Sequence, residues 1–383
     1  MKYWRGYIAA AICALIAWAL TSFSATHGTL IDMFYPYCSR LIQTSLASWC
    51  GGVDFCLWQV LAVLAIVILL ATIVLMIIFK WNVIQWLGWA LASVSLVYTL
   101  HVGVYGLNYH AGPLADDIRL TVTDYSLTQL VNATTYFRDM ANDLADDVPR
   151  NDDGSTAFPS FSEMAEMAGD GYQTLTYDRS FPVFAGSTAP VKELGWADMY
   201  TSMGIFGVTM PLTGEAAVNP NIPDPAIPFT MCHEMAHRMC IAQERDANLA
   251  GFLACDANSD PVFRYSGYFM AFRYCYNTLV LDDSSAAIAS AKQIYNGMNE
   301  NLRNDIIAYN DYFDRNIDAE AVDFATSVND TYIKTSGDKA GVDSYDDVTG
   351  LLVSWHLQEI YYPVHQDEAP IFNPLDKDQV DLG

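Results

Sequence analysis

The segment "TMCHEMAHRMCIAQERDANLAGF", residues 230–252, contains a His-Glu-x-x-His motif, and a second Glu follows its second His by seven residues. Side chains four residues apart on an α-helix project from the same face, one turn apart. His233 and His237 therefore point together, and two imidazoles placed in this way can bind one tetrahedral Zn²⁺. Glu234 lies about 100° round the helix from His233. It is placed beside the metal, where a general base takes a proton from a zinc-activated water.

Glu244 is the candidate third ligand, and its position dictates the local fold. On a continuous helix it would lie roughly 10 Å along the axis from His237, whereas zinc–ligand bonds are about 2 Å long. The helix must therefore end within residues 238–242. A second helix must begin near Gln243 and bring Glu244 back towards the metal.

Asp246 is the competing ligand, and it lies about 200° round the second helix from Glu244. Asn248 follows Glu244 by four residues, on the same face, where its amide can hydrogen-bond to a ligating imidazole. The residue four positions after Asp246 is Ala250, whose side chain has no polar group. This comparison favours Glu244 as the third ligand, with Asp246 beside it as the alternative.

Apolar and acidic residues occupy different regions of the chain. Of the 383 residues, 52% are hydrophobic, yet the formal net charge is −25. The long apolar runs fall before residue 107, whereas most carboxylates follow residue 115. An acidic chain does not favour nucleic acid as a partner, because phosphate binding requires Lys and Arg.

Three apolar runs predict transmembrane helices, and therefore a lipid bilayer as a partner. They cover residues 6–23, 57–79 and 83–106. A helix crosses about 30 Å of hydrocarbon with roughly 20 mainly apolar residues. The second run carries no charge, and only Gln59 and Thr72 interrupt its apolar residues.

The first run has two interpretations: a retained anchor, which we favour, and a cleaved secretory signal. Lys2 and Arg5 place the N-terminus in the cytoplasm, because cytoplasmic flanks carry the positive charges. Residues 24–56 then form an outer loop, and Lys80 lies in an inner turn. We expect residues 107–383 outside the cytoplasmic (inner) membrane, which the chain crosses more than once.

Beyond residue 106, patterning predicts a mainly helical domain, 107–362, and a loosely ordered acidic tail, 363–383. Apolar residues at helical spacing predict helices over residues 127–144, 160–168, 263–281, 283–313, 317–334 and 345–361. Ser126 and Gln129 predict a capping box at the start of the first of these helices.

A small sheet is expected just before the motif. Residues 203–219 contain β-branched residues, three Gly and one Pro, and they predict one or two short strands at a sheet edge. We expect the stretch "GEAAVN", 214–219, to pair there with an extended substrate backbone. Residues 220–230 contain four prolines, which predict an irregular segment leading into the motif helix.

The spacing of the cysteines does not reveal their pairing, so disulfides and free buried thiols both stay open. None is assigned to metal, because scattered cysteines lack the C-x-x-C pairs of a structural zinc site. The eight are Cys13, Cys38, Cys50, Cys56, Cys232, Cys240, Cys255 and Cys275.

A peptidase also needs a hydrogen-bond donor for the oxyanion that develops during hydrolysis. Tyr265 and Tyr268 are candidates, because their predicted helix follows the ligand-bearing segment. The alternative for each is ordinary packing, since the chain has 23 Tyr. His356 and His365 are further candidates for the same role.

The stretch "FGVTMPLTGEAAVNPNIPDPAIPFTMCHEMAHRMCIAQERDANLAGFLAC", residues 206–255, resembles a bacterial membrane-protein family known as domain of unknown function 3810. The segments "FYPYCSRLIQTSLASW" (34–49), "RYSGYFMAF" (264–272) and "SYDDVTGLL" (344–352) resemble that family too. Its members pair three N-terminal spans with an outer HExxH domain. The resemblance covers most of the chain and implies the same organisation here.

The family in turn resembles gluzincin metallopeptidases, in which HExxH supplies two zinc ligands and a downstream E-x-x-A-D/N supplies the third. The matching segment here is Glu244-Arg-Asp-Ala-Asn248, so the resemblance also implies Glu244 as a ligand. Two positions depart from the family, which usually has Gly where this chain has Cys240 and Glu where it has Asp246. A left-handed turn at 240 would cost Cys about 1 kcal/mol more than Gly.

We therefore expect a membrane-anchored, mainly α protein with three N-terminal transmembrane helices and an extracytoplasmic α+β domain. That domain is expected to be zincin-like, mostly helical, with a small edge sheet. The expected function is zinc-dependent hydrolysis of peptide or protein substrates, with Glu234 as the base. The alternative is a non-catalytic receptor or scaffold with a structural or vestigial metal site. Intramembrane proteolysis is disfavoured, because the motif follows a Pro-rich loop instead of lying within an apolar span.

Overall fold

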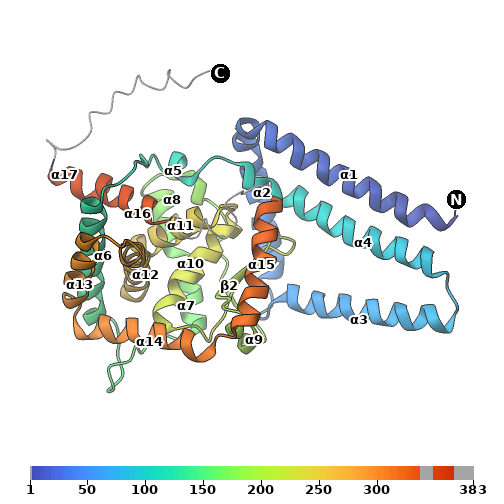
Figure 1. Cartoon of the computed structure of the whole chain (residues 1–383). Coiled ribbons are helices and arrows are strands. Elements are labelled where there is room, and N and C mark those ends of the chain that lie inside the picture. The colour runs from blue at the N-terminus through green and yellow to red at the C-terminus, as the bar shows by residue number, and fades with distance from the viewer. Residues whose placement is uncertain (1, 337–347, 366–383) are drawn as a thin grey trace.

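The computed structural model describes residues 2–336 and 348–365, which form three projecting helices and a mostly helical body (Figure 1). The three helices extend from one side of the body. We use "body" for the described residues outside these three helices. Of the predicted acidic tail, only residues 363–365 lie within the described part of the chain.

The projecting helices confirm the three predicted apolar runs. They are α1 (Arg5–Thr26), α3 (Leu57–Ile78) and α4 (Val83–Val104), and each is long and apolar enough to cross a membrane. α1 and α4 pack closely, because a Cβ at Gly6 would lie 2.4 Å from the carbonyl carbon of Gly88. Within the described chain, the apolar stretch of α3 is not buried against other helices.

The core of the body surrounds α12 (Pro261–Val280), which packs against α6 (Leu127–Asp147), α10 (Ile227–Arg238), α11 (Glu244–Ala257) and α16 (Val348–His356). The other helical elements of the described chain are η1 (Lys2–Trp4), α2 (Gly28–Cys50), η2 (Gly106–His110), α5 (Leu114–Asp117), α7 (Phe161–Met167), α8 (Asp170–Tyr177), η3 (Pro182–Phe184), α9 (Ala197–Ser202), η4 (Asp224–Ala226), α13 (Ser285–Asn296), α14 (Glu300–Asn316), α15 (Ala319–Ser336), η6 (Leu357–Tyr361) and α17 (Tyr362–Val364).

A three-stranded sheet lies beside α10. Its strands are β1 (Lys192–Glu193), β2 (Gly207–Met210) and β3 (Glu215–Val218), in the order β1-β3-β2. β1, which the sequence did not predict, runs parallel to β3, whereas β2 runs antiparallel to it. The expectation that "GEAAVN" (214–219) forms an edge strand is wrong, because β3 is buried and paired on both sides. Among the described strands, β1 and β2 lie at the two edges of the sheet.

The region expected to be an outer loop, residues 24–56, is mostly the helix α2. Only His27 separates α2 from α1, and residues 51–56 lead from it into α3. α2 packs on η2, β3 and α10, and the side-chain amide of Gln43 donates to the carbonyl of Pro211 (3.0 Å). This part of the predicted membrane domain therefore belongs structurally to the body.

Glu215 joins the sheet to α3. Its carboxylate accepts hydrogen bonds from the backbone N–H groups of Leu57 (2.7 Å) and Trp58 (2.9 Å), in the first turn of α3. Lys192 Nζ, on β1, lies 2.7 Å from the same carboxylate. A helix N-terminus stabilises a negative charge, so this buried ion pair fixes the start of α3 against the sheet.

The helix starts and stops mostly follow the predictions. The capping box between Ser126 and Gln129 is present at the start of α6, and a second one begins α7. The single helix predicted over 283–313 is wrong: α13 ends before Gly297, and Asn299 caps α14 by accepting from the Leu302 N–H (2.8 Å).

The irregular entry predicted over 220–230 is wrong for its last four residues. α10 already begins at Ile227, with Pro228 in its first turn. Proline is tolerated there because the first helical N–H groups have no partner within the helix. The predicted start of the last helix, at residue 345, lies outside the described residues.

Candidate metal centre

The predicted break between the two ligand-bearing helices is confirmed. α10 ends at Arg238, and the backbone of Cys240 is left-handed, with φ of 71°. The N–H of Cys240 donates to the His237 carbonyl (2.9 Å), and that of Ile241 donates to the Ala236 carbonyl (3.1 Å). This pair of bonds is the Schellman motif, which usually places Gly at the left-handed position. Here Cys takes that position, and α11 begins at Glu244, with Gln243 as its N-cap residue.

The turn brings together the three predicted ligands. His237 Nε2 lies 3.1 Å from His233 Nε2, and Glu244 Oε2 lies 3.3 Å from each of these nitrogens. Ligand atoms of a tetrahedral zinc site with bonds of about 2.0–2.1 Å lie about 3.3 Å apart. The three atoms therefore have the spacing of three corners of such a site, and the residues fit Zn²⁺.

The two imidazoles are held differently. His237 Nδ1 lies 2.9 Å from the carbonyl oxygen of Ile241, which belongs to the turn itself. A proton on Nδ1 satisfies this contact and leaves the Nε2 lone pair for a metal. His233 Nδ1 is buried and has no hydrogen-bond partner among the described residues.

The structure places Asn248 away from the predicted contact with an imidazole. Its Oδ1 accepts a hydrogen bond from the hydroxyl of Tyr274 (3.2 Å), and its Nδ2 is buried with no partner in the described chain. Asn248 is thus buried on the same helix as Glu244 but supports α12 instead of a ligand.

The charges of the cluster are strongly coupled. Burial alone would raise the pKa of Glu244, but His237 and His233 lower it far below its usual range. Burial alone would lower the pKa of His237, but Glu244 raises it to about 9. Without a cation, the buried carboxylate is balanced by a proton on an imidazole. A bound metal ion would supply the same positive charge, so these three residues could hold one.

Glu234 projects towards β2. Its Oε2 accepts a hydrogen bond from the hydroxyl of Thr209 (2.7 Å), and only 5% of the residue is exposed. A Cβ at Gly207 would lie 2.4 Å from Glu234 Oε1, so the strand passes this carboxylate at a distance that only Gly permits. Burial raises the pKa of Glu234, although His233 and His237 oppose that shift. The edge strand thus fixes the predicted base beside the ligands.

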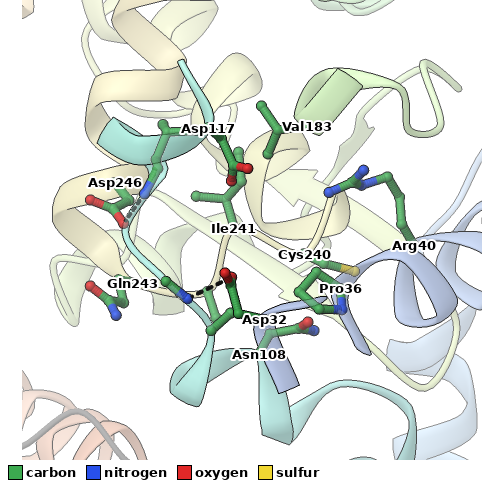
Figure 2. Close-up of a pocket in the computed structure, with 14 residues that line it drawn as sticks. Asp32, Pro36, Arg40, Asn108, Asp117, Val183, Cys240, Ile241, Gln243 and Asp246 are labelled. Atoms are coloured by element: carbon green, nitrogen blue, oxygen red, sulfur yellow. Dashed lines mark hydrogen bonds between the residues drawn. The ribbon is translucent and has the colours of Figure 1, made fainter. Parts of the chain in front are cut away.

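Asp246, the competing ligand, faces the opposite side of the turn. Its Oδ2 accepts a hydrogen bond from the N–H of Leu114 (2.9 Å), at the start of α5. Figure 2 shows this contact at one end of a small pocket, which α2 and the turn line together. The structure therefore separates Asp246 from the imidazoles and groups Glu244 with them.

α2 holds the turn from that opposite side. Arg40 Nε donates to the carbonyl of Met239 (3.1 Å), and the Cys240 thiol donates to Ser39 Oγ (3.2 Å). The Ser39 hydroxyl in turn donates to the carbonyl of Val104 (2.7 Å), at the end of α4. All eight cysteines lie within the described residues, and each is a free thiol.

Tyr265 and Tyr268 bind other partners. The Tyr265 hydroxyl donates to Asp305, and that of Tyr268 donates to Asp256 Oδ1 (2.7 Å). Both phenols lie in the packed core around α12, and neither contacts the three ligands. The prediction that they donate to an oxyanion is therefore not supported by their position, because their hydroxyls already donate hydrogen bonds to carboxylates.

His356 and His365 also lie outside the cluster. His356 is buried among the rings of Tyr136 and Phe137, and burial lowers its pKa to about 4. His365 stacks on the ring of Tyr361, with 4.2 Å between ring centroids.

Two tyrosines that the sequence did not single out pack on the turn between α10 and α11. Tyr105 lies at the end of α4, just before η2, and Tyr109 lies within η2. Both belong to one buried cluster with Cys240 and Ala242. Burial and Tyr332 raise the pKa of both phenols, and the charge of Glu244 adds to the shift. Both therefore stay protonated beside the ligands. Their spacing of about one helical turn after an apolar run suggests that they share a face. Nothing in the sequence, however, links them to the turn that contains Cys240 and Ala242.

No curated protein and no solved structure matches this chain. One family model does, over residues 31–353, which cover most of α2, all of α10 and α11, and most of α16. The chain therefore belongs to the family described as "Protein of unknown function (DUF3810)".

Proposed function

We propose that this protein is a membrane-anchored zinc metallopeptidase that hydrolyses peptide bonds outside the cytoplasmic membrane. The observation that carries the proposal is the cluster of two imidazole nitrogens and one carboxylate oxygen, separated by 3.1, 3.3 and 3.3 Å. A general base lies next to it on the same helix. The resemblance of this segment to gluzincin peptidases supports the same assignment, and Lys2 and Arg5 favour a cytoplasmic N-terminus.

His233, His237 and Glu244 would hold the zinc, which supplies Lewis acidity for activating water and polarising a carbonyl. Glu234 would take the proton from the attacking water and return it to the leaving amine. Burial raises the pKa of Glu234, so its carboxylate is a stronger proton acceptor than an exposed one. Thr209 would keep Glu234 in position through its 2.7 Å hydrogen bond.

The free edge of β2 would bind the substrate backbone. β2 carries Thr209 and Gly207, which contact the base, and its other edge pairs with β3. An extended peptide can add to such an edge through main-chain hydrogen bonds. Tyr105 and Tyr109 are the neutral phenols packed on the turn, and they replace Tyr265 and Tyr268 as candidate donors to the oxyanion.

The decisive test uses the full-length chain, purified in detergent and assayed for metal content and for cleavage of a peptide library. We expect about one zinc per chain, which His233→Ala loses. Glu234→Gln should retain the zinc but lose cleavage by at least about 100-fold. Glu166→Gln, which changes an exposed carboxylate on α7, is the matched control and should behave as wild type.

The alternative is a receptor or scaffold with a structural metal. It predicts zinc in the wild type and no cleavage of any peptide, with unchanged partner binding in Glu234→Gln. Absence of zinc from the wild type, or full cleavage by Glu234→Gln, would refute the peptidase mechanism.

A further inference from the structure

One face of α2 is apolar and exposed. Leu30 (50% exposed), Met33 (64%), Phe34 (59%), Tyr37 (64%) and Leu41 (54%) line it. Their spacing of three and four residues puts them on one side of the helix. These five large apolar side chains form a continuous patch, and exposure of such a patch to water is unfavourable.

The opposite face of α2 is committed to the body. Ile31, Ser39 and Gln43 are buried there. Both charged residues of the helix also bond to the body: Asp32 Oδ1 accepts from the Gly112 N–H (2.8 Å), and Arg40 donates to the turn. The exposed apolar face therefore carries no charged side chain.

The connections of α2 fix its orientation. α1 ends at Thr26 and α2 begins at Gly28, while α2 ends at Cys50 and α3 begins at Leu57. Two spans therefore leave the bilayer at the two ends of one helix that is about 34 Å long. A helix joined so closely at both ends must run along the membrane surface. Figure 1 shows α2 lying across the ends of the spans, where they meet the body.

We propose that the face of α2 formed by Leu30, Met33, Phe34, Tyr37 and Leu41 lies in the interfacial layer of the lipid bilayer. An uncharged apolar stripe opposite a polar face is the pattern of a helix that lies in that layer. The inference rests on the membrane anchoring in the proposed function and is independent of the zinc chemistry.

This placement has a consequence for the metal site. The face of α2 that contacts the body holds Met239 and Cys240, in the turn between two ligands. The diameter of a helix with its side chains is about 10–12 Å. The metal centre would therefore lie more than one helix diameter from the lipid, on the other side of the turn from α2.

The test attaches a fluorophore to one introduced cysteine in each variant of the full-length chain. Each variant is reconstituted in phosphatidylcholine vesicles. Cys38→Ser removes the exposed thiol of α2 and serves as the background. The test variant is Tyr37→Cys, and Tyr177→Cys is the matched control, since Tyr177 is 78% exposed on the body. Leu69→Cys, in the middle of α3, reports on membrane anchoring itself. Lipids with a nitroxide near the headgroup or deep in the acyl chain quench according to depth.

We expect headgroup-level nitroxides to quench position 37 at least about threefold more than position 177, and deep nitroxides to quench position 69. Leu41→Cys should behave like Tyr37→Cys. If position 69 is quenched but positions 37 and 41 behave like position 177, anchoring stands and the interfacial helix is refuted. Protection of position 37 from aqueous reagents without lipid quenching would indicate a second protein copy on this face and would also refute it. No quenching at position 69 would overturn the anchoring and this inference together.

Discussion

The metal centre and the core around α12 both bury polar side chains, but they satisfy them in opposite ways. In the core, each phenol donates to a carboxylate, Tyr265 to Asp305 and Tyr268 to Asp256. At the candidate metal centre, two imidazole nitrogens and one carboxylate oxygen lie 3.1–3.3 Å from one another. The core pairs need no further charge, whereas the three candidate ligands need one positive charge, from a proton on an imidazole or from a metal ion. The comparison distinguishes a region that stabilises the fold from one that could hold a metal ion.

The largest effect expected in the core follows loss of its buried ion pair. Arg150 Nη2 lies 2.8 Å from Asp305 Oδ2, and both side chains are largely buried. Asp305→Ala leaves that guanidinium without its partner and should lower the free energy of unfolding by about 3–5 kcal/mol. Denaturant unfolding in detergent measures it. Asp311→Ala removes an exposed pair on the same helix and should change stability by about 0.5 kcal/mol or less. Equal effects of the two would contradict this account.

His356 should make the core sensitive to acid. Its pKa falls to about 4 in the folded chain, compared with 6.5 for a free imidazole, because the ring is buried. Between these values the unfolded state binds a proton that the folded state does not, so stability decreases as the pH falls from 6.5 to 4. The loss should approach about 3 kcal/mol. Unfolding of wild type and His356→Phe at several pH values measures it, and parallel pH profiles would disprove it.

At the metal centre, Gly207→Ala should affect activity without affecting the fold. The added methyl group would displace the Glu234 carboxylate, whose Oε1 lies 2.4 Å from the ideal Cβ position. Cleavage should fall by about 100-fold, equivalent to about 2.7 kcal/mol of transition-state stabilisation, with zinc retained. Gly103→Ala is the control, because a Cβ there meets nothing within 4 Å. Full activity of Gly207→Ala would show that the base does not depend on this strand.

The smallest expected effect is a change in kcat, which differs between two pairs of tyrosines. Tyr105→Phe or Tyr109→Phe should lower kcat about tenfold with little change in KM, if one of these phenols donates to the oxyanion. Tyr268→Phe should leave kcat unchanged and lower the stability by about 1 kcal/mol, because it removes one buried hydrogen bond. Steady-state kinetics with thermal unfolding separates the two. A drop in kcat for Tyr268→Phe alone would reverse the assignment.

Local rules were enough to predict the ligand cluster. The one-turn spacing of His233 and His237 and the length of a zinc bond required a turn before Glu244, and the structure has it. The three long apolar helices and the capping box at Ser126 likewise follow from short-range patterns.

What the sequence did not predict depends on contacts between distant segments. Thr209 reaches Glu234 only because β2 lies at the sheet edge, and strand order is not encoded in either strand alone. Arg40 meets Met239 across 199 positions of sequence. Tyr265 was a candidate because it is near the motif in sequence, yet the packing of α12 turns it towards Asp305.

The hydrogen bonds that join Ser39 and Arg40 to Cys240 and Met239 limit which parts of the protein can be studied alone. A shortened chain starting after the last apolar helix would keep every proposed ligand but lose the support beneath the loop that joins them. Such a fragment would not represent the full-length protein, because the turn between the two histidines and Glu244 would lose its contacts with α2. Biochemistry on this protein is therefore best begun with the intact polypeptide in a lipid-like environment.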